Sequence, residues 1–188
     1  MRVVHSCTSK SFSGLESYVL DLVTWQYRQG KAVELYCREG SPLEEQARQR
    51  GIPLWTIGAN ERSGPLLWAK MAKAWKQKLD HDETTLHMHA GGEPWFHLPL
   101  LLSHFRLLRG LASRVRIVLH YHIWINHKKT DPVHRTLFSG IDEIWTSSET
   151  SRAHLAALLP VSRDRIRVVP YGRDVRALQE VPKTEWRR

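Results

Sequence analysis

The feature that most constrains the fold of this chain is the alternation of short apolar runs with stretches of helical periodicity. The runs are rich in Val, Ile and Tyr, which favour β-strands. They are Arg2–His5, Ala32–Cys37, Ile52–Ile57, Thr85–His89, Arg116–His122, Glu143–Ser147 and Ile166–Val169. This order is typical of βαβ units. We therefore expect an α/β fold with an open, mostly parallel sheet of about seven strands and helices on both faces.

Capping signals predict where several helices begin and end. Ser13 and Glu16 form a capping box in "SGLE", and Gly30 stands where the first helix should end. The segment "SPLEEQARQRG" repeats the pattern, with Ser41 as N-cap and Gly51 at the end. A further helix is expected in "SRAHLAALLP". The 188 residues are enough for one domain with a sizeable core.

The net charge of the chain indicates which classes of molecule it binds. Lys and Arg number 28 against 19 Asp and Glu, a formal net charge of +9. This excess favours phosphate-bearing partners, which include nucleic acid, anionic lipid and nucleotide-linked substrates. The basic residues are scattered, without a recognition helix or an RNP-like aromatic pattern, so nucleic acid is not expected. The eight Trp residues suit sugar faces, bases and membrane interfaces alike.

Cysteine usage and hydropathy favour a cytoplasmic protein. Cys7 and Cys37 lie in no zinc-like or redox spacing, which argues against a disulfide framework. The N-terminus lacks the layout of a signal peptide. No apolar run approaches the roughly 18 residues that indicate a membrane span.

One basic segment leaves contact with the inner face of a membrane open. "PLLWAKMAKAWKQKL" predicts a helix with Trp68, Met71, Trp75 and Leu79 on one face and lysines on the others. Such a helix could lie on an anionic bilayer. The commoner alternative, which we favour, is a helix packed on the sheet with its lysines in water.

Two loops could approach a ligand through their backbone. "SCTSKSFSGLES" leads from the first strand to a helix N-terminus, where N–H groups favour an anion, but it is neither a dinucleotide fingerprint nor a Walker A loop. Phosphate binding at Ser13 and Gly14 and simple helix capping both remain open. In "GGEPWFHLP", Gly91 and Gly92 with Trp95 could contact a sugar or base, or they could form a turn with Trp95 in the core.

Two H-x-H pairs end the fourth and fifth expected strands: His87 with His89, and His120 with His122. Alternate strand residues share a face, so each pair points to one side of the sheet near its carboxyl edge. Four imidazoles there could ligate a transition metal. Because no carboxylate or thiolate accompanies them, we favour packed histidines whose outer members meet a polar ligand, and we expect no metal.

In order along the chain, five motifs resemble the N-terminal half of the retaining GT-B glycosyltransferases of family GT4. The motifs are "SGLE", "TLHMHA", "VLHYHIW", "EIWTSSET" and "RIRVVPYGRD". The resemblance implies a Rossmann-like domain that binds the acceptor. In that family a second domain binds the nucleotide-sugar through an E-x7-E motif, and catalysis occurs in the cleft between the domains.

The resemblance also implies roles for individual residues. Ser13 and Gly14 would form the donor-phosphate loop, and His122 would be the catalytic residue that faces the transferred sugar. Ser13 replaces the first glycine of the family's loop. The residues implied on the sugar and acceptor side are His89, Gly91, Gly92, Trp95 and Ser148. The residues implied at the hinge are Gly172 and Asp174.

These assignments predict the organisation and activity of the chain. Residues 1–174 would be the N-terminal domain of the glycosyltransferase, and residues 175–188 would begin the linker to a C-terminal donor domain. The nucleotide-sugar would be the donor substrate, with no other cofactor, and a sugar or a lipid-linked molecule would be the acceptor. Alone, the chain would be inactive. The alternatives are a subunit of a split glycosyltransferase and a stand-alone binding module.

Overall fold

The structure, a computed structural model, describes residues 1–78, 83–102 and 115–172. Its strands form one parallel sheet in the order β3-β2-β1-β4-β5-β6-β7. The strands are β1 (Arg2–Cys7), β2 (Val33–Arg38), β3 (Leu54–Ile57), β4 (Thr84–Met88), β5 (Val115–Tyr121), β6 (Glu143–Thr146) and β7 (Ile166–Val168). The predicted α/β class and parallel sheet are confirmed.

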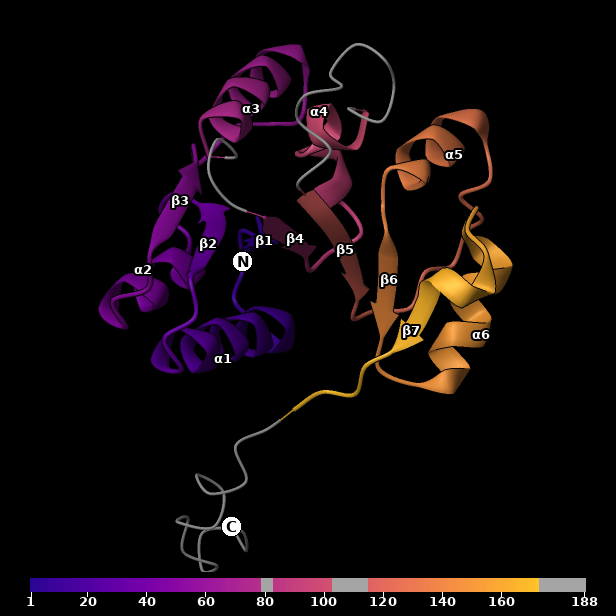
Figure 1. Ribbon diagram of the computed structural model, residues 1–188, viewed down its shortest axis with the longest axis horizontal. Coiled ribbons are helices and arrows are strands. Elements are labelled where there is room, and N and C mark those ends of the chain that lie inside the picture. The colour runs from indigo at the N-terminus through magenta and orange to yellow at the C-terminus, as the bar shows by residue number, and fades with distance from the viewer. Residues whose placement is uncertain (79–82, 103–114, 173–188) are drawn as a thin grey trace, which may run out of the picture.

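Helices cover both faces of this sheet, as predicted. The helices are α1 (Gly14–Arg28), α2 (Pro42–Gln49), α3 (Pro65–Lys78), α4 (Leu98–Leu101), α5 (Pro132–Ser139) and α6 (Glu149–Leu158), with 3-10 turns η1 (Glu93–Trp95) and η4 (Arg163–Arg165). Figure 1 shows α1 and α2 on one side of the sheet and α3, α4 and α5 on the other.

Two apolar cores hold these layers together. The smaller core joins α1 and α2 to β1 and β2, and Val19 and Leu35 are fully buried in it. The larger core lies on the opposite face, where Leu86, Leu119 and Phe138 pack among the other helices. Burial of this apolar surface is the main favourable contribution to folding.

The predicted helix caps form. The Glu16 carboxylate accepts the backbone N–H of Ser13 at 2.7 Å, and Ser41 Oγ accepts the N–H of the residue three positions on at 3.2 Å. Gly30 and Gly51 follow α1 and α2 with φ of +69°, a left-handed conformation that glycine adopts at little cost. The local sequence therefore sets these helix ends.

Helix α3 packs on the sheet, which confirms the favoured alternative for this basic segment. Met71 and Trp75 are buried in the larger core, and Trp68 Nε1 donates to the Trp95 carbonyl at 2.8 Å. Leu79, which we expected on the same face, lies outside the described residues. Among the described helices, none has the length and hydropathy needed to cross a membrane.

The strand order reverses between β1 and β4, which are neighbours in the sheet although two other strands separate them in the chain. In open parallel sheets, ligands bind outside the carboxyl ends of the strands at such a switch point. This edge is therefore where the functional side chains are expected.

Candidate functional site

Five histidines meet at the switch point, on the sheet face that α1 covers. We call His5, His87, His89, His120 and His122 the histidine cluster. The register pairs His5 of β1 with His87 of β4, and the two H-x-H pairs share this face as predicted. The ring centroids lie 4.1 Å apart in the first pair and 4.0 Å apart in the second.

A chain of hydrogen bonds runs through three of these rings. His5 Nε2 lies 2.9 Å from Gln26 Oε1 of α1, and His5 Nδ1 lies 2.9 Å from His89 Nε2. His89 Nδ1 is 3.2 Å from His122 Nε2, and His122 Nδ1 is 3.1 Å from the Tyr171 hydroxyl. With Gln26 as the terminal acceptor, each ring donates through Nε2, and Tyr171 donates to the last Nδ1. All three imidazoles are then neutral and fully partnered.

The other two rings lack such partners. His120 is fully buried, and neither of its nitrogens has a hydrogen-bond partner among the described residues. His87 Nε2 is likewise buried and without a partner among them. An unpartnered buried polar group lowers the stability of the fold by about 1–3 kcal/mol. Fold stability therefore does not explain these nitrogens, which makes them candidates for a functional role.

Burial keeps the cluster uncharged at neutral pH. Desolvation lowers the pKa of His5 and of His122 to about 4 and that of His120 to about 3. Desolvation, reinforced by the neighbouring rings, also lowers the pKa of His87 and His89 well below the usual value. The rings can therefore exchange hydrogen bonds or offer lone pairs, but they supply no positive charge.

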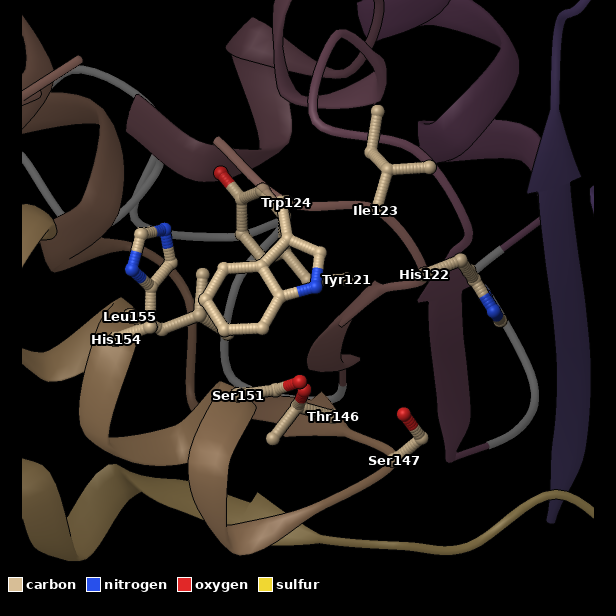
Figure 2. Close-up of a pocket in the computed structure, with 9 residues that line it drawn as sticks. All are labelled: Tyr121, His122, Ile123, Trp124, Thr146, Ser147, Ser151, His154 and Leu155. Carbon is tan, nitrogen blue, oxygen red and sulfur yellow. The ribbon is translucent and has the colours of Figure 1, made fainter. Parts of the chain in front are cut away.

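A small pocket opens beside His122. It has a volume of about 70 Å³ and is lined by Tyr121, His122, Ile123, Trp124, Thr146, Ser147, Ser151, His154 and Leu155. Figure 2 shows Trp124 between His154 and His122. The Trp124 side chain is 57% exposed and contacts the His154 ring, with 4.2 Å between the centroids. An exposed aromatic face beside hydroxyls and a neutral imidazole suits a sugar.

Comparison of the sequence with protein families finds a match to the model of Glycosyltransferase Family 4 over residues 12–177. The chain belongs to this family. The match confirms the resemblance that the five motifs carry. A comparison with curated proteins found no significant match.

Solved structures give the same fold. A glycosyltransferase from Rickettsia africae ESF-5 matches with a TM-score of 0.72 and 11% identity, over 98% of this chain and 47% of that one. Anabaena HepE in complex with UDP and glucose matches with a TM-score of 0.62 and 16% identity, over 94% of this chain and 46% of that one. The lipopolysaccharide outer core galactosyltransferase WaaB matches with a TM-score of 0.58 and 15% identity, over 90% of this chain and 45% of that one. The family 4 chain thus corresponds to one domain of a GT-B fold and spans about half of these structures.

The donor-phosphate loop predicted for this family 4 domain lies at the start of α1. Ser13 is the N-cap, and both Ser13 and Gly14 are exposed. A Cβ on Gly14 would meet no atom within 4 Å, so packing within the described chain does not require glycine there.

The structure brings only some of the predicted residues to His122. His89 is fully buried behind His122 and makes its hydrogen bonds to histidines. Ser148 is the N-cap of α6 and accepts the N–H of Ser151, while Ser147 and Ser151 line the pocket. Gly172 follows Tyr171 at the end of the described chain, and Asp174 lies outside it.

The "GGEPW" segment forms the turn that we gave as the second alternative. Gly91 fits closely, because a Cβ there would lie 3.1 Å from the Tyr121 ring, whereas Gly92 caps η1 and faces open space. Trp95 packs against the larger core and lines a separate apolar groove of about 450 Å³ with Trp68, Leu98 and Val133. It does not line the pocket that contains His122.

Sequence reasoning missed Glu93, which ties the two switch-point loops together. Its buried carboxylate accepts from Ser6 Oγ and from both the N–H and the hydroxyl of Thr8, the latter two at 2.7 and 2.8 Å. Burial raises the pKa of Glu93, although these hydrogen bonds act in the opposite direction and lower it. Its place between glycines and a proline signalled a loop, but nothing local indicated burial.

The missed aromatic partners, Tyr18, Trp145 and Tyr171, surround the cluster. The Tyr18 centroid lies 5.1 Å from that of His122, and the Trp145 centroid lies 4.9 Å from that of His87. Tyr171 stacks on His122 with 5.4 Å between centroids and 8° between planes. For Trp145 and Tyr171 a signal was available in their position, since β6 and β7 also end at this edge of the sheet.

Proposed function

We propose that this domain is the acceptor-binding, N-terminal half of a retaining glycosyltransferase that moves a sugar from a nucleotide-sugar to an acceptor hydroxyl. The observation that carries the proposal is the position of His122 in a family 4 domain: half-exposed, at the switch point, in the wall of a pocket that also contains the exposed Trp124. The pocket itself, at about 70 Å³, is well below the roughly 300 Å³ of a complete ligand pocket. A pocket this small is what we expect if the domain supplies only one wall of an interdomain cleft.

In this proposal, His122 binds a hydroxyl of the transferred sugar through Nδ1, where the sugar would displace the Tyr171 hydroxyl. Because its pKa is lowered to about 4 by burial, the ring is neutral at pH 7 and acts through hydrogen bonds. Charge on the leaving diphosphate must then be stabilised elsewhere. The exposed N-terminus of α1 at Ser13 and Gly14 offers N–H groups and a helix dipole, and basic residues of the second domain would add to them.

A nucleotide-sugar donor is supported by Anabaena HepE, whose structures contain UDP with glucose and UDP-glucose. The acceptor would enter beside Trp124, with a sugar or a lipid-linked molecule as the candidate. Two buried free thiols, Cys7 and Cys37, fit a reducing cytoplasm. Peripheral membrane contact stays part of the proposal through the basic run "HFRLLRGLASRVR", most of which lies outside the described residues.

The first test is turnover by the purified chain. We expect no sugar transfer from UDP-glucose or other common nucleotide-sugars, because half of the cleft is lacking. Measurable transfer by the 188-residue chain would contradict this expectation. The coding sequence beyond Arg188 gives an independent test: an E-x7-E motif within a second domain supports the proposal, whereas a stop codon there favours a split enzyme.

The second test joins the domain to its donor half. His122→Ala should lower kcat/KM at least roughly 100-fold, because it removes a hydrogen bond at the reacting sugar. His127→Ala, an exposed histidine five residues on, is the matched control and should leave the rate unchanged. Equal rates for the two variants would remove His122 from the reaction centre.

A further inference from the structure

The loop that follows β5 exposes two large apolar side chains beside the pocket that contains His122. Ile123 is 67% exposed and Trp124 is 57% exposed, whereas the next residue, Ile125, is buried in the larger core. Both exposed side chains line the pocket, so an aromatic face lies where a ligand would enter. We propose that Trp124 is the platform on which a neutral sugar of the acceptor stacks, a role that rests on the proposed function and names the acceptor as a carbohydrate.

The Trp124 side chain is held in place by α6. The centroid of its ring lies 4.2 Å from that of His154, with 62° between the planes. His154 Nε2 lies 2.7 Å from the carbonyl oxygen of Ile125, and because a carbonyl only accepts, Nε2 carries the proton. The imidazole therefore binds the loop and contacts the indole at the same time. A side chain fixed in this way loses little conformational freedom when a ligand stacks on it.

Three hydroxyl groups line the same pocket from the end of β6 and the start of α6. They belong to Thr146, Ser147 and Ser151, and Figure 2 shows them below the Trp124 indole. Ser151 Oγ accepts from Ser148 Oγ at 3.0 Å, whereas no hydrogen bond joins the hydroxyl of Thr146 or Ser147 to another described residue. A pyranose ring has C–H groups on its faces and hydroxyls around its edge, so an indole beside free hydroxyls matches it.

The pocket that contains Trp124 has no permanently charged side chain. None of the nine described residues that line it is Lys, Arg, Asp or Glu. Burial lowers the pKa of His122 to about 4, so this imidazole is neutral at pH 7. The N-terminus of α6 is capped by Ser148, whose Oγ accepts the N–H of Ser151 at 3.2 Å. A phosphate or carboxylate would therefore lose hydration without meeting a countercharge, which favours a neutral sugar.

Trp124 and His122 are close enough to hold two sugars that react with each other. They are two residues apart in the chain, so their Cα atoms are at most about 7 Å apart. Both line one pocket, and His122 Nδ1 is the nitrogen assigned above to the transferred sugar. A carbohydrate on the indole would therefore present a hydroxyl next to that sugar, which is the arrangement that transfer requires.

The test is binding of neutral glycosides to the 188-residue chain, which needs no donor half. Saturation-transfer NMR is recorded with the methyl glycosides of glucose, galactose, mannose and N-acetylglucosamine, and with a glucose phosphate as the anionic probe. We expect at least one methyl glycoside to bind with millimolar affinity and to change the tryptophan fluorescence over the same concentrations. Absence of binding by every methyl glycoside, or tighter binding of the phosphate than of methyl glucoside, would overturn the proposal.

Matched variants locate the sugar on the indole. Trp124→Ala should weaken binding of the methyl glycoside at least roughly 10-fold, because the stacking face is lost. Ser147→Ala should weaken it roughly 3- to 10-fold through one hydrogen bond. Trp25→Ala is the control and should leave binding unchanged, because Trp25 is 60% exposed on α1 and lies outside the pocket. Unchanged binding in Trp124→Ala, or an equal loss in Trp25→Ala, would refute the site, with circular dichroism confirming that each variant folds.

The joined enzyme separates the role of Trp124 from the proposed function. If it transfers sugar and Trp124→Ala leaves the KM for the acceptor unchanged, Trp124 is not the platform and the proposed function stands. If the chain binds glycosides at Trp124 but the joined enzyme transfers no sugar, the proposed function fails and the binding site stands.

The source of the acceptor sugar is identified with the octyl and methyl glycosides of the sugar that binds. Below its micelle concentration, the octyl glycoside should bind more tightly if the sugar is lipid-linked, and equally if the sugar ends a saccharide. Either result supports a sugar on Trp124, provided that Trp124→Ala weakens both.

Discussion

Strands β4 and β5 present two different surfaces, one on each face of the sheet. The side chains on one face pack into the larger apolar core; they are Leu86, Met88, Ile117, Leu119 and Tyr121. The alternating side chains on the other face include four of the five histidines of the cluster. Burial of the first set stabilises the fold. Burial of the unpartnered nitrogens of His120 and of His87 Nε2 costs stability.

The polar groups around Ser6, on the apolar face, differ from His87 and His120 of the histidine cluster, because they are partnered. Ser6 Oγ contacts both the Glu93 carboxylate and His97 Nε2, the latter at 2.8 Å. The second ring nitrogen of His97 lies 3.3 Å from Trp75 Nε1. The hydrogen bonds around Ser6 therefore stabilise the structure, whereas two rings of the cluster have buried nitrogens without a partner among the described residues. Four measurements test this difference.

The largest effect should come from the apolar face. Leu119→Ala removes a fully buried side chain of β5 and should lower the free energy of unfolding by about 2–5 kcal/mol, through lost burial and the cavity left behind. Urea unfolding measures it. A loss below about 1 kcal/mol would mean that this face does not carry the stability of the domain.

Removal of the buried carboxylate should have the next largest effect. Glu93→Ala leaves the Ser6 hydroxyl and the Thr8 N–H without their acceptor, which should cost about 1–3 kcal/mol of unfolding free energy. The exposed Glu149→Ala is the matched control, with an expected change within about 0.5 kcal/mol. Equal effects would contradict the tying role of Glu93.

Acidification should weaken the fold through His97. Burial lowers the pKa of His97 to about 3, whereas the unfolded chain keeps a value of about 6.5. The unfolded state therefore binds a proton first, so the stability is complete above pH 6.5 and falls as the pH drops toward 3. This residue alone contributes a slope of up to about 1.4 kcal/mol per pH unit. His97→Gln should flatten the measured slope over this window by that amount, and an unchanged slope would place the titration elsewhere.

The smallest effect on stability is expected at His120. His120→Phe replaces two unpartnered buried nitrogens by apolar atoms and should leave the unfolding free energy unchanged or raise it by about 1 kcal/mol. Thermal unfolding measures this. A loss of more than about 2 kcal/mol would show that His120 has a structural partner, and the two faces would then differ less than we conclude.

Much of the fold could be predicted because its signals are local. The seven predicted strands lie within two residues of the observed ones, since a short apolar run rich in Val, Ile and Tyr marks each strand on its own. The caps at Ser13 and Ser41 depend on residues three positions apart and formed as expected.

The site was predicted less completely. Trp95, predicted in the loop after the fourth strand, and His122, predicted at the end of the fifth, line different cavities, because η1 turns Trp95 toward α3.

The α/β class, the family and the shared face of each H-x-H pair follow from the amino-acid sequence alone, because the order of strands and helices, the family motifs and the two-residue period of a strand are local properties of the chain. The contact of His5 with His89, 84 residues away, and that of His122 with Tyr171 beyond the last strand depend on the tertiary structure. Strand register and crossover connections set those contacts. Burial beneath α1 then decided that the rings are neutral, because the desolvation of an imidazole depends on what covers it and not on its neighbours in sequence.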